Sequence, residues 1–317
     1  MDIHYVAPLR SAWARMKTML FNPFNLDKWL VLGFSAWLAR LAGGGGGGGV
    51  RVNPRAGHVG SLHVRRSLRE AWAFVQAHPV WRTWIIVIAA AVGLIFLVLV
   101  WISSRGKFIF LDNVVHDRAK IAEPWRRFAR LGDSLFLWRL CYLLACLLVV
   151  GTLAAAAVTA AGGLSGFGFA SVRSLTITIL AGFAAGLVGI ACAYVSLFLD
   201  SFVVPLMYKD EIGAVEAWRR FLPRLERRLG AFLLYGLFVV ALLVVVGVGV
   251  LVVGLATCCV GLLLVVLPYV GTVILLPLLV TYRAFTLEFL AQFDPALAIL
   301  PPPAVPPAPT PASTPGP

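Results

Sequence analysis

The chain has 317 residues, of which 60% are hydrophobic and only 13% are charged, and its mean hydropathy is +0.90. A soluble domain has about 25% charged residues, so this composition excludes an ordinary water-soluble protein. The net charge of +13 does not indicate nucleic-acid binding, because the cations lie between apolar runs and no groove-reading motif accompanies them. Contact with anionic lipid headgroups explains this distribution better.

Residues 1–28 are predicted to form an amphipathic segment at the membrane interface. Apolar residues recur at helical spacing, with Arg10, Arg15 and Lys17 on the other side of the helix. The apolar run 29–42 that follows is short for a membrane crossing, which needs about 20 residues.

Seven glycines at 43–49 open a linker that is predicted to extend to residue 63. No Lys-Ser/Thr pair follows the glycines, so a flexible tether is a better interpretation of residues 43–63 than a phosphate-binding loop.

Longer apolar runs predict further spanning helices at about 84–103, 134–160, 175–199, 231–255 and 260–282. Pro268 and Pro277 are expected to kink the last of them. The helical membrane domain is thus predicted to cover 29–293. Residues 294–317 are a Pro-rich, mostly uncharged tail that is expected to be disordered.

Two segments, 84–160 and 175–255, resemble copies of one unit. Each contains a span, a Phe-Leu-Asp exit at Asp112 or Asp200, a short helix with the motif Trp-Arg-Arg-Phe, and a second span. Both copies run in the same direction through the membrane, which indicates a degenerate parallel repeat. We therefore predict an all-α polytopic membrane protein, with about six transmembrane helices and amphipathic elbow helices at the interface.

The repeat also predicts a polar cluster. A helix over 175–200 is longer than the hydrocarbon core is thick, so both aspartates are expected at headgroup level on one side. Beside the arginines of the elbow helices, the two aspartates would either neutralise these arginines or form a binding site for a cation or a lipid headgroup. The candidate residues of this cluster are Asp112, Asp200, Arg126, Arg127, Arg219 and Arg220. The candidate interfacial anchors are Trp13, Trp72, Trp125 and Trp218.

The sequence contains no H-E-x-x-H, G-x-S-x-G or paired Cys/His motif. We therefore expect a non-enzymatic protein without a catalytic, cofactor or metal site. Its expected partners are the bilayer and anionic headgroups, together with a protein partner or a second copy, and no nucleic acid. The first hypothesis is lipid organisation or partner scaffolding by the basic elbow helices. The alternative is a carrier or flippase-like protein for a lipid or other amphiphile, using a groove between the repeats.

The distribution of Lys and Arg among the loops favours an orientation with both termini in the cytoplasm. In this orientation the elbow helices lie on the cytoplasmic face.

Several short motifs stand out along the chain, namely Phe21-Asn22-Pro23-Phe24 with Lys28-Trp29, the glycine tract, and residues 105–113, 200–208 and 287–293. Together they resemble a family of uncharacterised multi-pass inner-membrane proteins from bacteria, over about residues 1–295. The resemblance implies a location in the bacterial inner membrane and assigns no activity. The arrangement of spans and elbows also looks like the membrane domain of some bacterial glycerophosphodiester phosphodiesterases. Their catalytic barrel is absent here, so the likeness implies no such activity.

Overall fold

The computed structural model of the protein describes residues 4–42, 79–161, 172–257, 260–293 and 297–301. Every regular element within these ranges is a helix, which confirms the predicted all-α class. The glycine-rich linker 43–63, Trp72 and most of the tail 294–317 lie outside the described residues.

Four of the predicted spans are long helices that are apolar enough to cross a membrane. They are α4 (Pro79–Val115), α6 (Ala129–Ala160), α7 (Val172–Phe198) and α10 (Leu229–Ala256). Helix α7 continues through a π-helical turn, η3 (Leu199–Val203), into α8 (Val204–Asp210). The chain is therefore a polytopic α-helical membrane protein.

The other two predicted spans differ from expectation. Run 29–42 lies mainly in α2 (Leu26–Arg40), whose 15 residues extend only about 22 Å and fall short of a hydrocarbon core of roughly 30 Å. Run 260–282 is divided among α11 (Val260–Val266), α12 (Pro268–Ile274) and α13 (Leu276–Ala291). Helices α12 and α13 are bent by 66° and count as a fifth span if taken together. The described residues thus support four or five spans, rather than six.

The prolines explain the division of the last run. Pro268 begins α12, and Pro277 lies in the first turn of α13. Proline has no N–H to donate and disfavours a helical conformation in the residue before it. The kinks predicted at these two positions are confirmed as helix boundaries.

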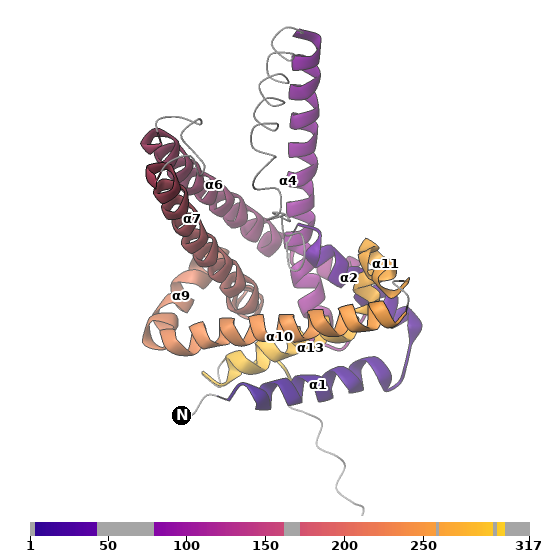
Figure 1. Ribbon diagram of the computed structural model, residues 1–317. Coiled ribbons are helices and arrows are strands. Elements are labelled where there is room, and N and C mark those ends of the chain that lie inside the picture. The colour runs from indigo at the N-terminus through magenta and orange to yellow at the C-terminus, as the bar shows by residue number, and fades with distance from the viewer. Residues whose placement is uncertain (1–3, 43–78, 162–171, 258–259, 294–296, 302–317) are drawn as a thin grey trace, which may run out of the picture.

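The core lies where the helices meet at one end of the molecule, which we call the base. Figure 1 shows α4 and the α6–α7 pair diverging from this base, while α10 and α13 run across it beside α1 (Val6–Phe21). Fully buried side chains of the base include Phe108, Leu111, Phe202, Val203, Met207, Tyr235, Phe285 and Phe289. The outer lengths of the long helices instead expose rows of Leu, Ile and Val, a surface that suits lipid contact.

Helix α2 packs closely against the base-proximal half of α4. A Cβ atom on Gly106 would lie only 2.6 Å from the backbone carbonyl carbon of Leu38, so glycine is required for this approach. The start of α2 is capped, because the Asn25 side chain accepts a hydrogen bond from the Lys28 N–H at 3.2 Å.

The two copies of the repeat share an order of elements but differ in their packing. In each copy the exit helix is followed by a residue with positive φ, Asp117 at 51° or Glu211 at 53°. Elbow helix α5 (Ala122–Arg127) or α9 (Ala214–Arg227) comes next, and then a long helix. Helix α6 packs on α7, whereas α10 lies across the base (Figure 1).

Candidate functional site

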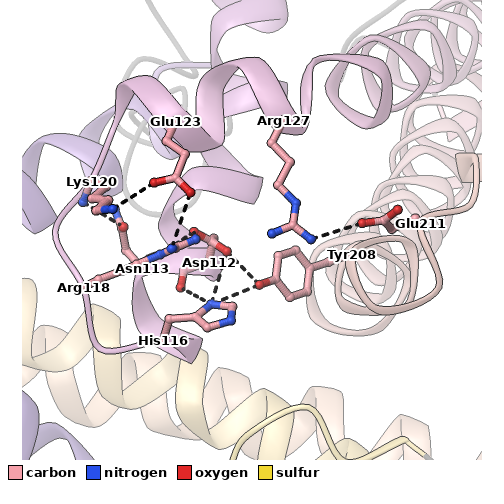
Figure 2. Close-up of polar contacts among 9 residues, drawn as sticks. All are labelled: Asp112, Asn113, His116, Arg118, Lys120, Glu123, Arg127, Tyr208 and Glu211. Atoms are coloured by element: carbon pink, nitrogen blue, oxygen red, sulfur yellow. Dashed lines mark hydrogen bonds and ion pairs between the residues drawn. The ribbon is translucent and has the colours of Figure 1, made fainter.

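Asp112 lies fully buried in the last turn of α4 and is surrounded by hydrogen-bond donors (Figure 2). Its Oδ2 accepts hydrogen bonds from Arg118 Nη2 at 2.6 Å and Nε at 3.1 Å. Its Oδ1 accepts one from the Tyr208 hydroxyl at 2.8 Å and lies 3.2 Å from His116 Nδ1. A buried carboxylate is stable when it is paired and hydrogen-bonded, and Asp112 meets both conditions.

A second layer of contacts continues this site along the turn into α5. Glu123 lies between Lys120 Nζ at 3.0 Å and Arg118 Nη1 at 3.8 Å (Figure 2). The hydrogen bond and positive charge of Lys120 lower the pKa of Glu123, while the hydrogen bonds to Asp112 raise the pKa of Arg118. Every charge of this turn therefore has an opposite charge beside it.

Asp200 lies in η3 and has different partners. The Lys107 ammonium group of α4 forms an ion pair with its carboxylate. From α13, Arg283 Nη1 donates a hydrogen bond to the Asp200 backbone carbonyl at 2.7 Å. Both cationic residues are 8% exposed, so two buried cations converge on one acidic residue.

The sequence explains why the Asp200 carbonyl is free to accept this bond. In η3 the Val204 N–H bonds to the carbonyl of Leu199, which is a spacing of five residues. The Asp200 carbonyl would need the N–H of Pro205 at the same spacing, and proline has none. Arg283 supplies the missing donor.

Arg139 of α6 is a third cation at this site. It lies close enough to Asp200 and Lys107 to interact electrostatically with both. Its Nη1 is 3.4 Å from the hydroxyl oxygens of Ser103 and Ser104, and no carboxylate in the described part of the chain forms an ion pair with it. Lys107, Arg139 and Arg283 thus outnumber the single carboxylate of Asp200.

The structure divides the predicted cluster, because none of its four arginines forms an ion pair with Asp112 or Asp200 in the described part of the chain. Arg127 pairs with Glu211 at 3.3 Å, and Arg220 with Asp210 at 2.8 Å. Arg219 lies 3.6 Å from Glu216, and Arg126 is exposed. These arginines lie on exposed faces of the elbow helices, whereas Asp112 is fully buried and Asp200 pairs with Lys107 of α4.

The predicted Trp anchors mostly take part in packing. Trp125 packs edge-to-face on Trp101 with ring centroids 6.0 Å apart, and the Arg105 guanidinium lies over both rings. Trp218 stacks on Trp138 at 5.5 Å. Trp13 is 43% exposed, as an interfacial anchor requires.

Sequence reasoning missed several residues that build these two sites, namely Lys107, Arg118, Tyr208 and Arg283. Lys107, Arg139 and Arg283 carried a usable signal, since a charged residue next to or inside an apolar run is a functional candidate. Tyr208 carried none, because its role depends on a contact with a distant part of the chain.

The fold and its two buried polar sites define a polytopic α-helical membrane protein. Among the described residues, no group of three or more His, Cys, Asp or Glu is arranged to hold a metal ion. The chain belongs to a family of unknown function, DUF7544, whose model matches residues 3–300. No curated protein and no solved structure matches the chain.

Proposed function

We propose that the protein is a non-enzymatic membrane protein that organises anionic lipid at one face of the bilayer, through exposed arginines of its elbow helices. We define the elbow arginines as Arg126 of α5, Arg219 and Arg227 of α9, and Arg228, which directly follows α9; all four are exposed. Anionic headgroups attract such residues, with about 1 kcal/mol for each Lys or Arg near the surface.

The observation that carries this proposal is the two-sided character of α9. Ala214, Ala217 and Phe221 of this helix are buried against the base. The opposite side exposes Arg219, whose side chain is 80% accessible, and also Val215 at 70%. A helix that presents arginines and apolar side chains next to the ends of spans suits the headgroup region.

The same reasoning supports a proposal for location and orientation. We propose that the base faces the cytoplasm of a bacterial cell, with the protein in the inner membrane. The elbow arginines, α1 and the segment 297–301 all belong to the base, so both termini would be cytoplasmic.

The test compares the lipid around the protein with the lipid of the whole membrane. The protein is extracted with its surrounding lipid by a styrene–maleic acid copolymer, and the lipids are measured by mass spectrometry. We expect anionic lipid to be enriched around the wild type. Replacing all four elbow arginines with glutamine should reduce this enrichment by about twofold or more.

A matched control removes positive charge at the opposite ends of the spans. Arg82 lies near the start of α4 and Arg173 near the start of α7, and both are exposed. The double variant Arg82→Gln and Arg173→Gln should keep the wild-type enrichment. If the elbow variant also keeps it while remaining folded, the proposed function is overturned.

A further inference from the structure

The site around Asp200 has an excess of positive charge that the protein itself does not neutralise. Lys107, Arg139 and Arg283 surround one carboxylate, and Lys107 and Arg283 are almost fully buried. Arg283 Nε is buried and has no hydrogen-bond partner. Unpaired charge is costly away from water, so this arrangement favours a bound anion.

A cavity of about 160 Å³ opens beside Arg139 and Asp200, between α4, α6 and α7. Arg139 and Asp200 supply its charged wall, together with the polar side chains of Tyr142 and Ser196. The remaining wall is apolar and includes Phe96, Leu97 and Val100 from α4 and Leu140 and Leu143 from α6. Because Lys107 and Arg283 add positive charge around Asp200, this wall favours an occupant that combines a negative charge with an apolar part.

The surroundings of the cavity indicate where such a molecule comes from. Phe96 and Leu97 line the cavity and are also 44% and 37% exposed, on the length of α4 that presents apolar residues outward. Figure 1 shows α4 and α6 diverging from the base. In a bilayer this opening faces lipid, which provides anionic amphiphiles at high local concentration.

The geometry points to a binding site for one anionic phospholipid, with its phosphate at Arg139 and the adjoining apolar part against α4 and α6. A volume of about 160 Å³ corresponds to roughly five water molecules at about 30 Å³ each. This volume suits a phosphate group and a few carbon atoms, and the acyl chains would continue along the exposed surface of α4.

This site does not depend on the proposed function, because it uses no elbow arginine. The elbow arginines would enrich many headgroups through their charge, whereas the cavity would hold one lipid through defined contacts. Variants of the elbow arginines and variants of the cavity can therefore disprove one proposal without affecting the other.

The experiment measures lipid binding by the full chain after it has been delipidated in neutral detergent. Phosphatidylglycerol, phosphatidylcholine with the same acyl chains, or inorganic phosphate is added in separate titrations. Native mass spectrometry gives the number of lipids bound, and thermal unfolding gives the stabilisation. We expect one phosphatidylglycerol to bind about tenfold or more tightly than phosphatidylcholine, and to raise the unfolding midpoint. Inorganic phosphate should have little effect, and equal stabilisation by phosphate would overturn the assignment to a lipid.

Two variants test the position of the site by different means. Arg139→Gln removes the unpaired cation, and Leu97→Trp fills the cavity from its apolar wall. Each should weaken phosphatidylglycerol binding by about tenfold. The matched control Leu94→Trp adds the same side chain at an exposed position of α4 that does not line the cavity, and should bind as the wild type does.

The pattern across the variants decides the proposal. Wild-type affinity in a folded Leu97→Trp variant would overturn it, even if Arg139→Gln failed to fold. Loss of the single lipid from the elbow variant, with retention in Arg139→Gln, would place the lipid at the elbows and also overturn it.

Discussion

Asp112 and Asp200 follow the same Phe-Leu dipeptide, yet they occupy opposite kinds of environment. Asp112 lies in the last turn of α4, where Arg118, Tyr208 and His116 satisfy a fully buried carboxylate. Asp200 lies almost three turns before the end of α8, and its side chain is 42% exposed. It also borders the cavity that Arg139 lines.

The difference shows that the role of a carboxylate depends on the balance of charge around it. At Asp112 the charges are paired and the site is closed, so it joins the α4–α5 turn to α8. At Asp200 cations are in excess and space remains beside them. The first arrangement is expected to stabilise the fold, and the second to favour a ligand.

The largest effect that tests this comparison is expected at Asp112. Asp112→Asn leaves Arg118 without its charged partner and weakens the hydrogen bond from Tyr208, so the free energy of unfolding should fall by about 2 to 3 kcal/mol. Denaturant or thermal unfolding in detergent measures this loss. Asp117→Asn is the control, because its side chain is 59% exposed and pairs with Lys28 at the surface, and it should cost about 1 kcal/mol or less. Equal losses in the two variants would show that burial gives Asp112 no special role.

Asp200→Asn should give a smaller loss that depends on lipid. In neutral detergent the variant leaves Lys107 without its ion-pair partner, with an expected cost of about 1 to 2 kcal/mol. Phosphatidylglycerol should restore more of that stability than phosphatidylcholine does, since an anion can replace the lost carboxylate. Asp112→Asn should show no such rescue. Identical lipid responses in the two variants would remove the distinction between the sites.

The smallest effect concerns Glu123, whose side chain is 53% exposed. Lys120 lowers the pKa of Glu123 in the folded protein, so its stabilising contribution is present above the unfolded-state pKa of about 4.3 and is lost as the pH falls through the folded-state value. Unfolding midpoints of the wild type and Glu123→Gln should therefore differ near neutral pH and converge in acid. A difference that persists unchanged at low pH would show that it does not arise from ionisation of Glu123.

The long helices could be predicted from the sequence because each depends on one continuous apolar run. The predictions over 84–103, 134–160, 175–199 and 231–255 required only length and hydropathy, and all four coincide with long helices. Run 29–42 lacked the length for a crossing. In 260–282, local proline geometry determined the boundaries more strongly than overall hydropathy did.

The polar sites could be predicted only in part, because their partners come from distant segments. The sequence singled out Asp112 and Asp200, but it paired them with the arginines of the two Trp-Arg-Arg-Phe motifs. Lys107 and Arg283 reach Asp200 from helices that hydropathy alone cannot place side by side. Tyr208 likewise meets Asp112 across 96 positions of sequence.

The π-turn at Leu199–Val203 has a consequence for how the two aspartates are connected. A π-turn contains one residue more than an α-turn, and one residue corresponds to about 100° of rotation around a helix. Everything in α8 is therefore rotated relative to an uninterrupted α-helix, and Tyr208 is among these residues. The π-turn therefore sets the angular position at which the Tyr208 hydroxyl reaches Asp112. In the same turn, Arg283 donates a hydrogen bond to the free carbonyl of Asp200. The two carboxylates are thus coupled through the winding of a single helix, without a contact between them.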